Sequence, residues 1–241
     1  MANSEKSFRD RQAKAQLLQD TVENFTPVFA PADTSLNATN FQLTINGVDA
    51  GNSNVETLAS NYTTAATQRL VLVKTVKERV TQALSYIKSN KAWDAQCKTA
   101  KMAADKLRNI SPPKETAPPP GDGGATPPAE ENKRSTGQQA YAELAAHFES
   151  FINAAMSCAG YAPPSVAITA SELGGLLSQF KGLNSFTSGL SGQIKTAREL
   201  RYRLYFSSEA LADKFQSAKD AVKGQYGQSS AQFAAVKSLK W

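Results

Sequence analysis

Histidine and cysteine are the scarcest of the chemically active residues in this sequence. Its 241 residues include one histidine, His147, and two cysteines, Cys97 and Cys158. These three side chains cannot complete a Cys₄ or Cys₂His₂ zinc site, so we expect no metal. A lone helical histidine is more often structural than catalytic. Two cysteines in alanine-rich surroundings make no disulfide framework, and we interpret them as small buried residues.

The signatures of common enzyme classes are also missing. The sequence contains no GxSxG elbow, no GxGxxG fingerprint and no P-loop pattern. Its carboxylates are scattered rather than paired, and no Glu-x-x-His pair supports a di-iron bundle. We therefore expect no catalytic residues and no cofactor. An enzyme remains a third hypothesis only, dependent on a closed pocket that the sequence does not reveal.

Long apolar runs are absent as well. No stretch of eighteen apolar residues occurs, and the run Leu70–Val73 is followed by Lys74. The sequence therefore predicts no membrane insertion. Residues 1–16 lack the apolar region of a secretory signal. We expect a cytoplasmic protein, with export by a route that needs no such signal left open.

The sequence has no persuasive alternating run of β-branched residues, which predicts little or no sheet. Hydrophobic residues make up 41% and charged residues 20%, a balance typical of a globular chain. Apolar residues recur at steps of three and four, the spacing of amphipathic helices. The expected fold class is therefore all-α.

Proline is concentrated in one segment. Seven of the eleven prolines fall between Ile110 and Gly137, together with several glycines. Proline blocks helix, so we expect 111–137 to be a Pro/Gly-rich linker between two domains, 1–110 and 138–241. Docking of Pro118–Pro120 on a polyproline-binding domain is the alternative role.

The two sides of this linker resemble one another. At an offset of 132 residues, the windows 31–72 and 163–204 match without a gap. Arg69 then pairs with Arg201, and Leu58 pairs with Leu190. A shift of three residues restores the match farther on. Coincidental phasing of amphipathic helices is the alternative, but the sustained register predicts an internal duplication.

Each half is accordingly expected to be a bundle of four to five antiparallel helices. We expect helix breaks at Gly51–Asn52 and between Phe180 and Phe186. The expected helices are approximately 7–24, 35–50, 53–87, 92–107, 141–158, 171–180, 186–205, 208–223 and a short one that ends at Trp241.

Positive charge is unevenly distributed. Residues 69–110 hold ten basic and three acidic side chains, and residues 195–241 hold nine and four. Such regions can contact the phosphates of a polyanion, or they can simply be solvated faces that keep the protein soluble. The candidate polyanion-binding residues are Lys74, Lys77, Lys88, Lys91, Lys98, Lys101, Arg198, Arg201 and Arg203.

Two short motifs carry a resemblance. The N-terminal helix contains Ser-Phe-Arg-Asp-Arg at Ser7–Arg11, and a Tyr-Ala-Pro-Pro turn occupies Tyr161–Pro164. In these motifs the chain resembles a family of bacterial hypothetical proteins with a duplicated helical plan. The resemblance implies a bacterial origin, and it brings no activity, cofactor or functional residues.

These observations favour a non-enzymatic structural or interaction protein that assembles with itself through duplicated bundles. Expected partners are proteins, including a second copy of the chain. Trp93 and Trp241 are candidate contacts, unless each closes its own bundle. Non-specific nucleic-acid binding through the basic helices is the alternative hypothesis.

Overall fold

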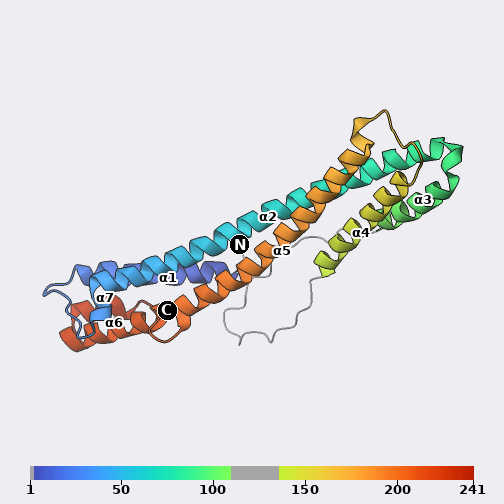
Figure 1. The fold of residues 1–241 in the computed structure, drawn as a ribbon. Helices are drawn as coiled ribbons and strands as arrows, with labels where there is room; N and C mark the ends of the chain where they lie inside the picture. Colours follow the sequence, from blue (N-terminus) through green and yellow to red (C-terminus); the bar gives the residue numbers. More distant parts are fainter. Residues whose placement is uncertain (1–2, 110–135) are drawn as a thin grey trace. The chain divides into compact units, whose positions relative to one another are not determined.

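A computed structural model describes residues 3–109 and 136–241 of the chain (Figure 1). These residues form helices, and no β-strand occurs among them, which confirms the expected all-α class. The expected linker, 111–137, lies outside the described residues except for Thr136 and Gly137, which begin a helix.

The helices differ widely in length, from a single 3₁₀ turn to 52 residues. In chain order they are α1 (Asn3–Glu23), the 3₁₀ helix η1 (Thr34–Leu36), α2 (Ala38–Ser89), η2 (Lys91–Trp93), α3 (Asp94–Asn109), α4 (Thr136–Met156), η3 (Val166–Ile168), α5 (Ala170–Phe206), α6 (Leu211–Tyr226) and α7 (Ala231–Lys237).

The expected helix break at Gly51–Asn52 is wrong, because α2 continues through it. Asn52 is buried, and its Nδ2 donates hydrogen bonds to Gln12 Oε1 and to the Tyr205 hydroxyl, each at 2.9 Å. A Cβ at Gly51 would lie 2.9 Å from Leu204 Cδ1. Both residues therefore serve packing against other helices, which overrides their weak helix propensity.

The expected break between Phe180 and Phe186 is also wrong, since α5 is uninterrupted. Phe180 and Thr187 are both buried, so one helical face continues across the expected break. The hydroxyl of Thr169 accepts the Glu172 N–H at 3.4 Å, which caps the start of α5. At the end of α6, Gly227 adopts φ 91°, a backbone conformation that favours glycine.

The chain divides into two compact units, and each draws on both sides of the linker. Within the described residues, the first unit contains 3–59 and 192–241, and the second contains 60–109 and 136–191. Helices α2 and α5 each supply residues to both units. The composition of these units thus differs from the expected division into 1–110 and 138–241.

The first unit combines α1 and the start of α2 with the end of α5, α6 and α7. Phe8 from α1 makes an edge contact with Tyr205 from α5, with ring centroids 4.8 Å apart. The buried residues of its core are Phe8, Ala15, Leu18, Val22, Leu36, Phe41, Ile45, Val48, Tyr205, Leu211, Phe215, Ala218, Val222 and Val236.

The second unit combines the remainder of α2, α3, α4 and the start of α5, and α3 packs along α4 (Figure 1). At one end, Tyr86 and Trp93 pack against Tyr161, which follows α4. The Tyr86 hydroxyl donates to the carbonyl oxygen of Ala162 at 3.0 Å, and this bond joins α2 to the turn after α4.

None of the helices in the described ranges combines the length and hydrophobicity needed to cross a membrane.

Candidate interaction surfaces

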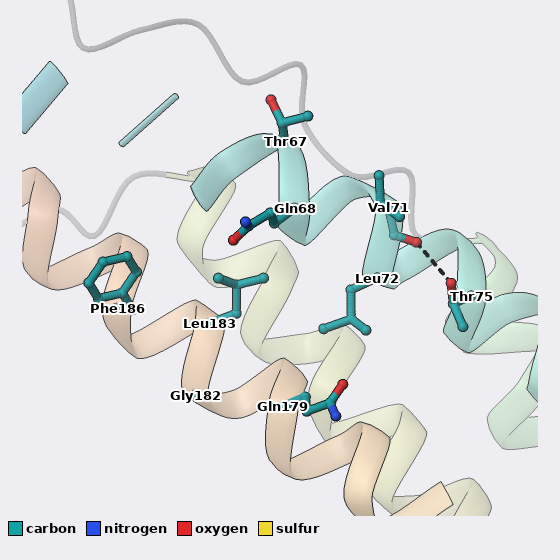
Figure 2. A pocket seen from close by; sticks show the side chains of 9 residues that line it. All are labelled: Thr67, Gln68, Val71, Leu72, Thr75, Gln179, Gly182, Leu183 and Phe186. Carbon is teal, nitrogen blue, oxygen red and sulfur yellow. Dashed lines mark hydrogen bonds between the residues drawn. The ribbon is translucent and has the colours of Figure 1, made fainter. Parts of the chain in front are cut away.

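An apolar groove lies between α2 and α5 within the second unit. It encloses about 620 Å³, and Figure 2 shows Leu72 from α2 and Leu183 from α5 among its apolar side chains. None of its lining residues is charged; they are Thr67, Gln68, Val71, Leu72, Thr75, Gln179, Gly182, Leu183 and Phe186. Such a surface suits an uncharged apolar partner.

Two large apolar side chains on this groove remain open to solvent. Val71 is 62% exposed and Phe186 is 57% exposed. Leu70 is 39% exposed and lines a separate hollow with Lys74 and Lys77. Single exposed apolar residues are common on proteins, but two on one groove make this groove a candidate contact surface.

The exposed face of α5 carries glycine at steps of seven, at Gly175, Gly182 and Gly189. A Cβ at any of the three would meet no atom within 4 Å among the described residues. Each glycine inside a helix costs about 1 kcal/mol relative to alanine, and here no packing within the chain requires it. The three glycines leave a low strip on which another helix can lie closely.

The candidate basic residues fall into both units. Lys74, Lys77, Lys88, Lys91, Lys98 and Lys101 all belong to the second unit. Arg198, Arg201 and Arg203 lie in the part of α5 that belongs to the first unit.

The six lysines lie on a hairpin formed by the end of α2, η2 and α3, which we call the basic hairpin (69–109). Lys77 Nζ donates to the carbonyl oxygen of Arg108 at 3.2 Å, and Arg108 Nη2 donates to Thr81 Oγ1 at 3.0 Å. The end of α3 therefore lies beside this part of α2, and the two helices are antiparallel. Burial lowers the pKa of Lys77, and the side chain of this residue links α2 to α3.

Arg201 is not available to a polyanion, although the sequence suggested it. Its exposed fraction is 3%, and its guanidinium lies 4.2 Å from the ring centroid of Phe8. Arg69 in the second unit is equally buried, with its guanidinium 3.7 Å from the ring centroid of Tyr141. Both arginines are core residues that stack on an aromatic ring, from α1 in the first unit and from α4 in the second.

The tryptophans proposed as exposed contacts lie against the cores instead. Trp93 is buried, and its Nε1 donates to the carbonyl oxygen of Ala159 at 3.1 Å. Trp241 is partly buried, with its ring centroid 5.1 Å from that of Phe215. Trp93 therefore closes its bundle, which was the alternative role.

A polar network joins α1 to α2 in the first unit. Arg9 donates to both carboxyl oxygens of Glu56 at 2.8 Å and to Asp49 at 2.6 Å. Gln12 Nε2 donates to the same Asp49 oxygen at 2.9 Å. Hydrogen bonds from Arg9 lower the pKa of Glu56, and those from Gln12 and then Arg9 lower the pKa of Asp49. The network holds helices together and offers no free charge for chemistry.

Tyr205 links this network to the core. Its hydroxyl accepts from Asn52 and donates to the carbonyl oxygen of Phe8 at 2.7 Å. Burial raises the pKa of Tyr205 to about 12, so it is a neutral structural donor near neutral pH. Because its side chain is fully buried, Tyr205 is not available to stack with the bases of a nucleic acid.

The remaining reactive side chains form no cluster. His147 is half-buried on α4. Cys158 is buried and Cys97 is half-buried, and burial raises the pKa of the Cys158 thiol. Within 3–109 and 136–241, no three histidine, cysteine or acidic residues are placed to hold a metal ion.

Comparisons with protein-family models, with curated proteins and with solved structures gave no match to this chain. Sequence reasoning did not find the apolar groove as a site. The signal that could have found it is the heptad spacing of glycines around Phe186 in a segment expected to be helical.

Proposed function

We propose that the protein is a non-enzymatic interaction protein that pairs with a second copy of itself through the exposed face of α5. The observation that carries this proposal is the combination of a projecting Phe186 and an uncovered strip of helical glycines beside a groove lined by uncharged residues. A single face that offers both a projection and a hollow can complement itself about a two-fold axis.

The sequence of α5 defines the geometry of this pairing. In an antiparallel pair with its two-fold axis at Gly182, Gly175 of one copy faces Gly189 of the other. Phe186 then faces Ser178 of the other copy. Ser178 lies next to Gly175, Gln179 and Gly182 on the helix surface. These four residues form a hole of the kind that receives one side chain of the facing helix in paired helices.

The uncharged lining of the groove suits the same uncharged surface of a second copy better than it suits a charged surface. The chain carries a formal net charge of +6, so two copies repel each other at long range and the attraction must come from the groove itself. The groove lining contains no charged residue, so pairing there buries no unpaired charge. The free energy that favours pairing comes from the removal of the Val71 and Phe186 side chains from water.

We also propose that the chain arose by an internal duplication of residues 1–110 and 138–241. Helices α1 and α4 are both 21 residues long, and η1 and η3 are separated by the same 132 residues as the beginnings of α2 and α5. Arg69 and Arg201 are equally buried, and they stack on rings from α4 and α1, which are the first helices of the two sequence halves. Leu58 is half-buried where Leu190 is buried, so the match is imperfect.

The substitution Gly182→Ala should change the stability of the fold and the affinity of the dimer in opposite directions. A Cβ there meets nothing within 4 Å, so Gly182→Ala should stabilise the folded chain, by up to about 1 kcal/mol. The same methyl group holds two copies of α5 apart. We expect the melting temperature to rise while the dimer dissociation constant, measured by sedimentation equilibrium of the full chain, increases at least several-fold.

A second variant removes the projecting side chain. Phe186→Ala should weaken the dimer about 30-fold, the effect of losing a buried aromatic anchor. Leu200→Ala is the matched control, because Leu200 is 53% exposed but belongs to the first unit. A wild-type chain that stays monomeric over the whole concentration series would overturn the proposal, as would equal effects of Phe186→Ala and Leu200→Ala.

A further inference from the structure

The basic hairpin presents its positive charge on one side. On α3, residues 98, 101, 105 and 108 recur at steps of three and four, so they share one stripe of the helix. Residues 74, 77, 81 and 88 share a stripe on α2 in the same way. The bonds from Arg108 to Thr81 and from Lys77 to Arg108 bring the two stripes together. Lys74, Lys88, Lys98 and Lys101 therefore line the same outer side of the hairpin.

These four lysines are exposed, and their charges are not neutralised locally. Within the described part of the chain, none of the four forms an ion pair with a carboxylate. Asp105, the acidic member of the α3 stripe, already pairs with Arg108 at 3.5 Å. The hairpin as a whole holds ten basic and three acidic residues, and apart from the buried Arg69 its positive charge includes these four exposed lysines.

We propose that this side of the basic hairpin binds the phosphate backbone of double-stranded nucleic acid, without reading its sequence. Helix α3 has 16 residues and is about 24 Å long, enough to lie along several consecutive phosphates. Flexible lysine ammonium groups are point charges that suit phosphate contacts and carry no base specificity.

The residues beside these lysines favour duplex over other polyanions. Binding of single strands relies on exposed aromatic rings that stack with bases, but Trp93 is buried and Tyr86 packs between Trp93 and Tyr161. An anionic membrane surface would call for a row of exposed bulky apolar residues. The exposed large apolar residues of the hairpin are Leu70 and Val71 on α2 and Met102 on α3, and they do not form such a row.

The test is fluorescence anisotropy of the full chain with a short labelled duplex DNA of random sequence. Neutralisation of four phosphates predicts that affinity falls about 100-fold between about 50 mM and about 200 mM salt. Replacement of Lys74, Lys88, Lys98 and Lys101 together by glutamine should abolish most of the binding at low salt. It should also flatten the salt dependence.

The matched control is glutamine at four exposed lysines of the first unit, Lys195, Lys223, Lys237 and Lys240. It removes the same net charge, and we expect it to lower affinity less than about three-fold if the contacts are local. Circular dichroism establishes that both variants fold. The proposal is overturned if wild type does not bind duplex DNA at low salt or if both variants lose affinity equally. Binding to anionic lipid vesicles with none to DNA would also overturn it.

Discussion

The two compact units are both built from helices, but the contacts that hold the helices together differ between them. In the first unit, Arg9 joins α1 to two carboxylates of α2, and Leu204 lies directly against Gly51. In the second, Leu72 and Leu183 line an open groove (Figure 2). Under the proposed duplication these two leucines correspond to Leu204 and Gly51. A surface closed by internal contacts in one unit is thus left open in the other, which identifies the open one as the candidate interface.

The turn after α1 and the turn after α4 are also held in place by different kinds of contact. In the second unit, Tyr86, Trp93 and Tyr161 form an aromatic cluster next to the turn. In the first unit the Tyr226 hydroxyl donates to the carbonyl oxygen of Pro27 at 2.6 Å, and Gln225 bonds to the same turn. Under the proposed duplication these turns are equivalent, and one is held by ring packing while the other is held by hydrogen bonds from side chains to the backbone.

The largest expected effect comes from the two cores. Phe151 and Leu18 are fully buried at corresponding positions of α4 and α1. Phe151→Ala should lower the free energy of unfolding by about 3–5 kcal/mol and Leu18→Ala by about 2–5 kcal/mol, because each leaves a cavity. Urea unfolding followed by circular dichroism measures both.

Exposed Met102→Ala is the reference for this experiment and should change stability by less than about 0.5 kcal/mol. If either core variant were as mild as the reference, its unit would be loosely packed and the two units would not be comparable.

The buried arginines give an intermediate effect. A double-mutant cycle between Arg201→Met and Phe8→Leu should show a coupling of about 1–2 kcal/mol, because the stacked guanidinium is desolvated. The cycle between Arg69→Met and Tyr141→Leu should give a similar value. Thermal or urea unfolding provides the four stabilities that each cycle needs.

Arg203 is exposed and serves as the control partner, so its cycle with Phe8→Leu should give a coupling near zero. A large coupling in one unit and none in the other would count against the proposed duplication, since the matched stacking is its main support.

The smallest effect is expected from the Arg9 network. Arg9→Met should cost about 1 kcal/mol at neutral pH, because the three charged side chains are partly exposed and screened. Asp49 and Glu56 have pKa values lowered from 3.8 and 4.5. Their contribution is therefore complete above about pH 4.5 and is lost as pH falls through the lowered values.

The stability difference between wild type and Arg9→Met should accordingly shrink in acid when urea unfolding is measured across this pH range. Arg11→Met is the matched control, because Arg11 lies over the Phe206 ring rather than beside a carboxylate. A difference for Arg9→Met that does not depend on pH would show that packing, and not charge, is what Arg9 contributes.

The sequence was sufficient to predict the helical class and most helix positions. The step of three and four in apolar residues is local information, and capping by Thr169 follows from residue type. The break at Gly51–Asn52 was wrong because the buried bond from Asn52 to Tyr205 spans 153 residues. The residues near Asn52 in the sequence do not indicate that it has a distant partner. At this position tertiary packing outweighs the low helix propensity of glycine and asparagine.

The candidate sites were predictable to a similar extent. The lysines of the basic hairpin were found from charge and spacing alone, and exposure keeps Lys74, Lys98 and Lys101 available. Charge alone could not separate them from Arg201, whose burial depends on Phe8 far away in the chain. Sequence periodicity also cannot tell an apolar residue of the core from Phe186, which is left uncovered.

The hydrogen bond from the Tyr205 hydroxyl to Phe8 joins residues 197 positions apart. During synthesis, the first helix therefore leaves the ribosome long before the segment that completes its core exists. Until then the apolar face of α1 has only the start of α2 to cover it, and chains with such late partners are prone to aggregate. The first unit is thus a part of this protein whose core cannot be completed until the end of α5 has been synthesised.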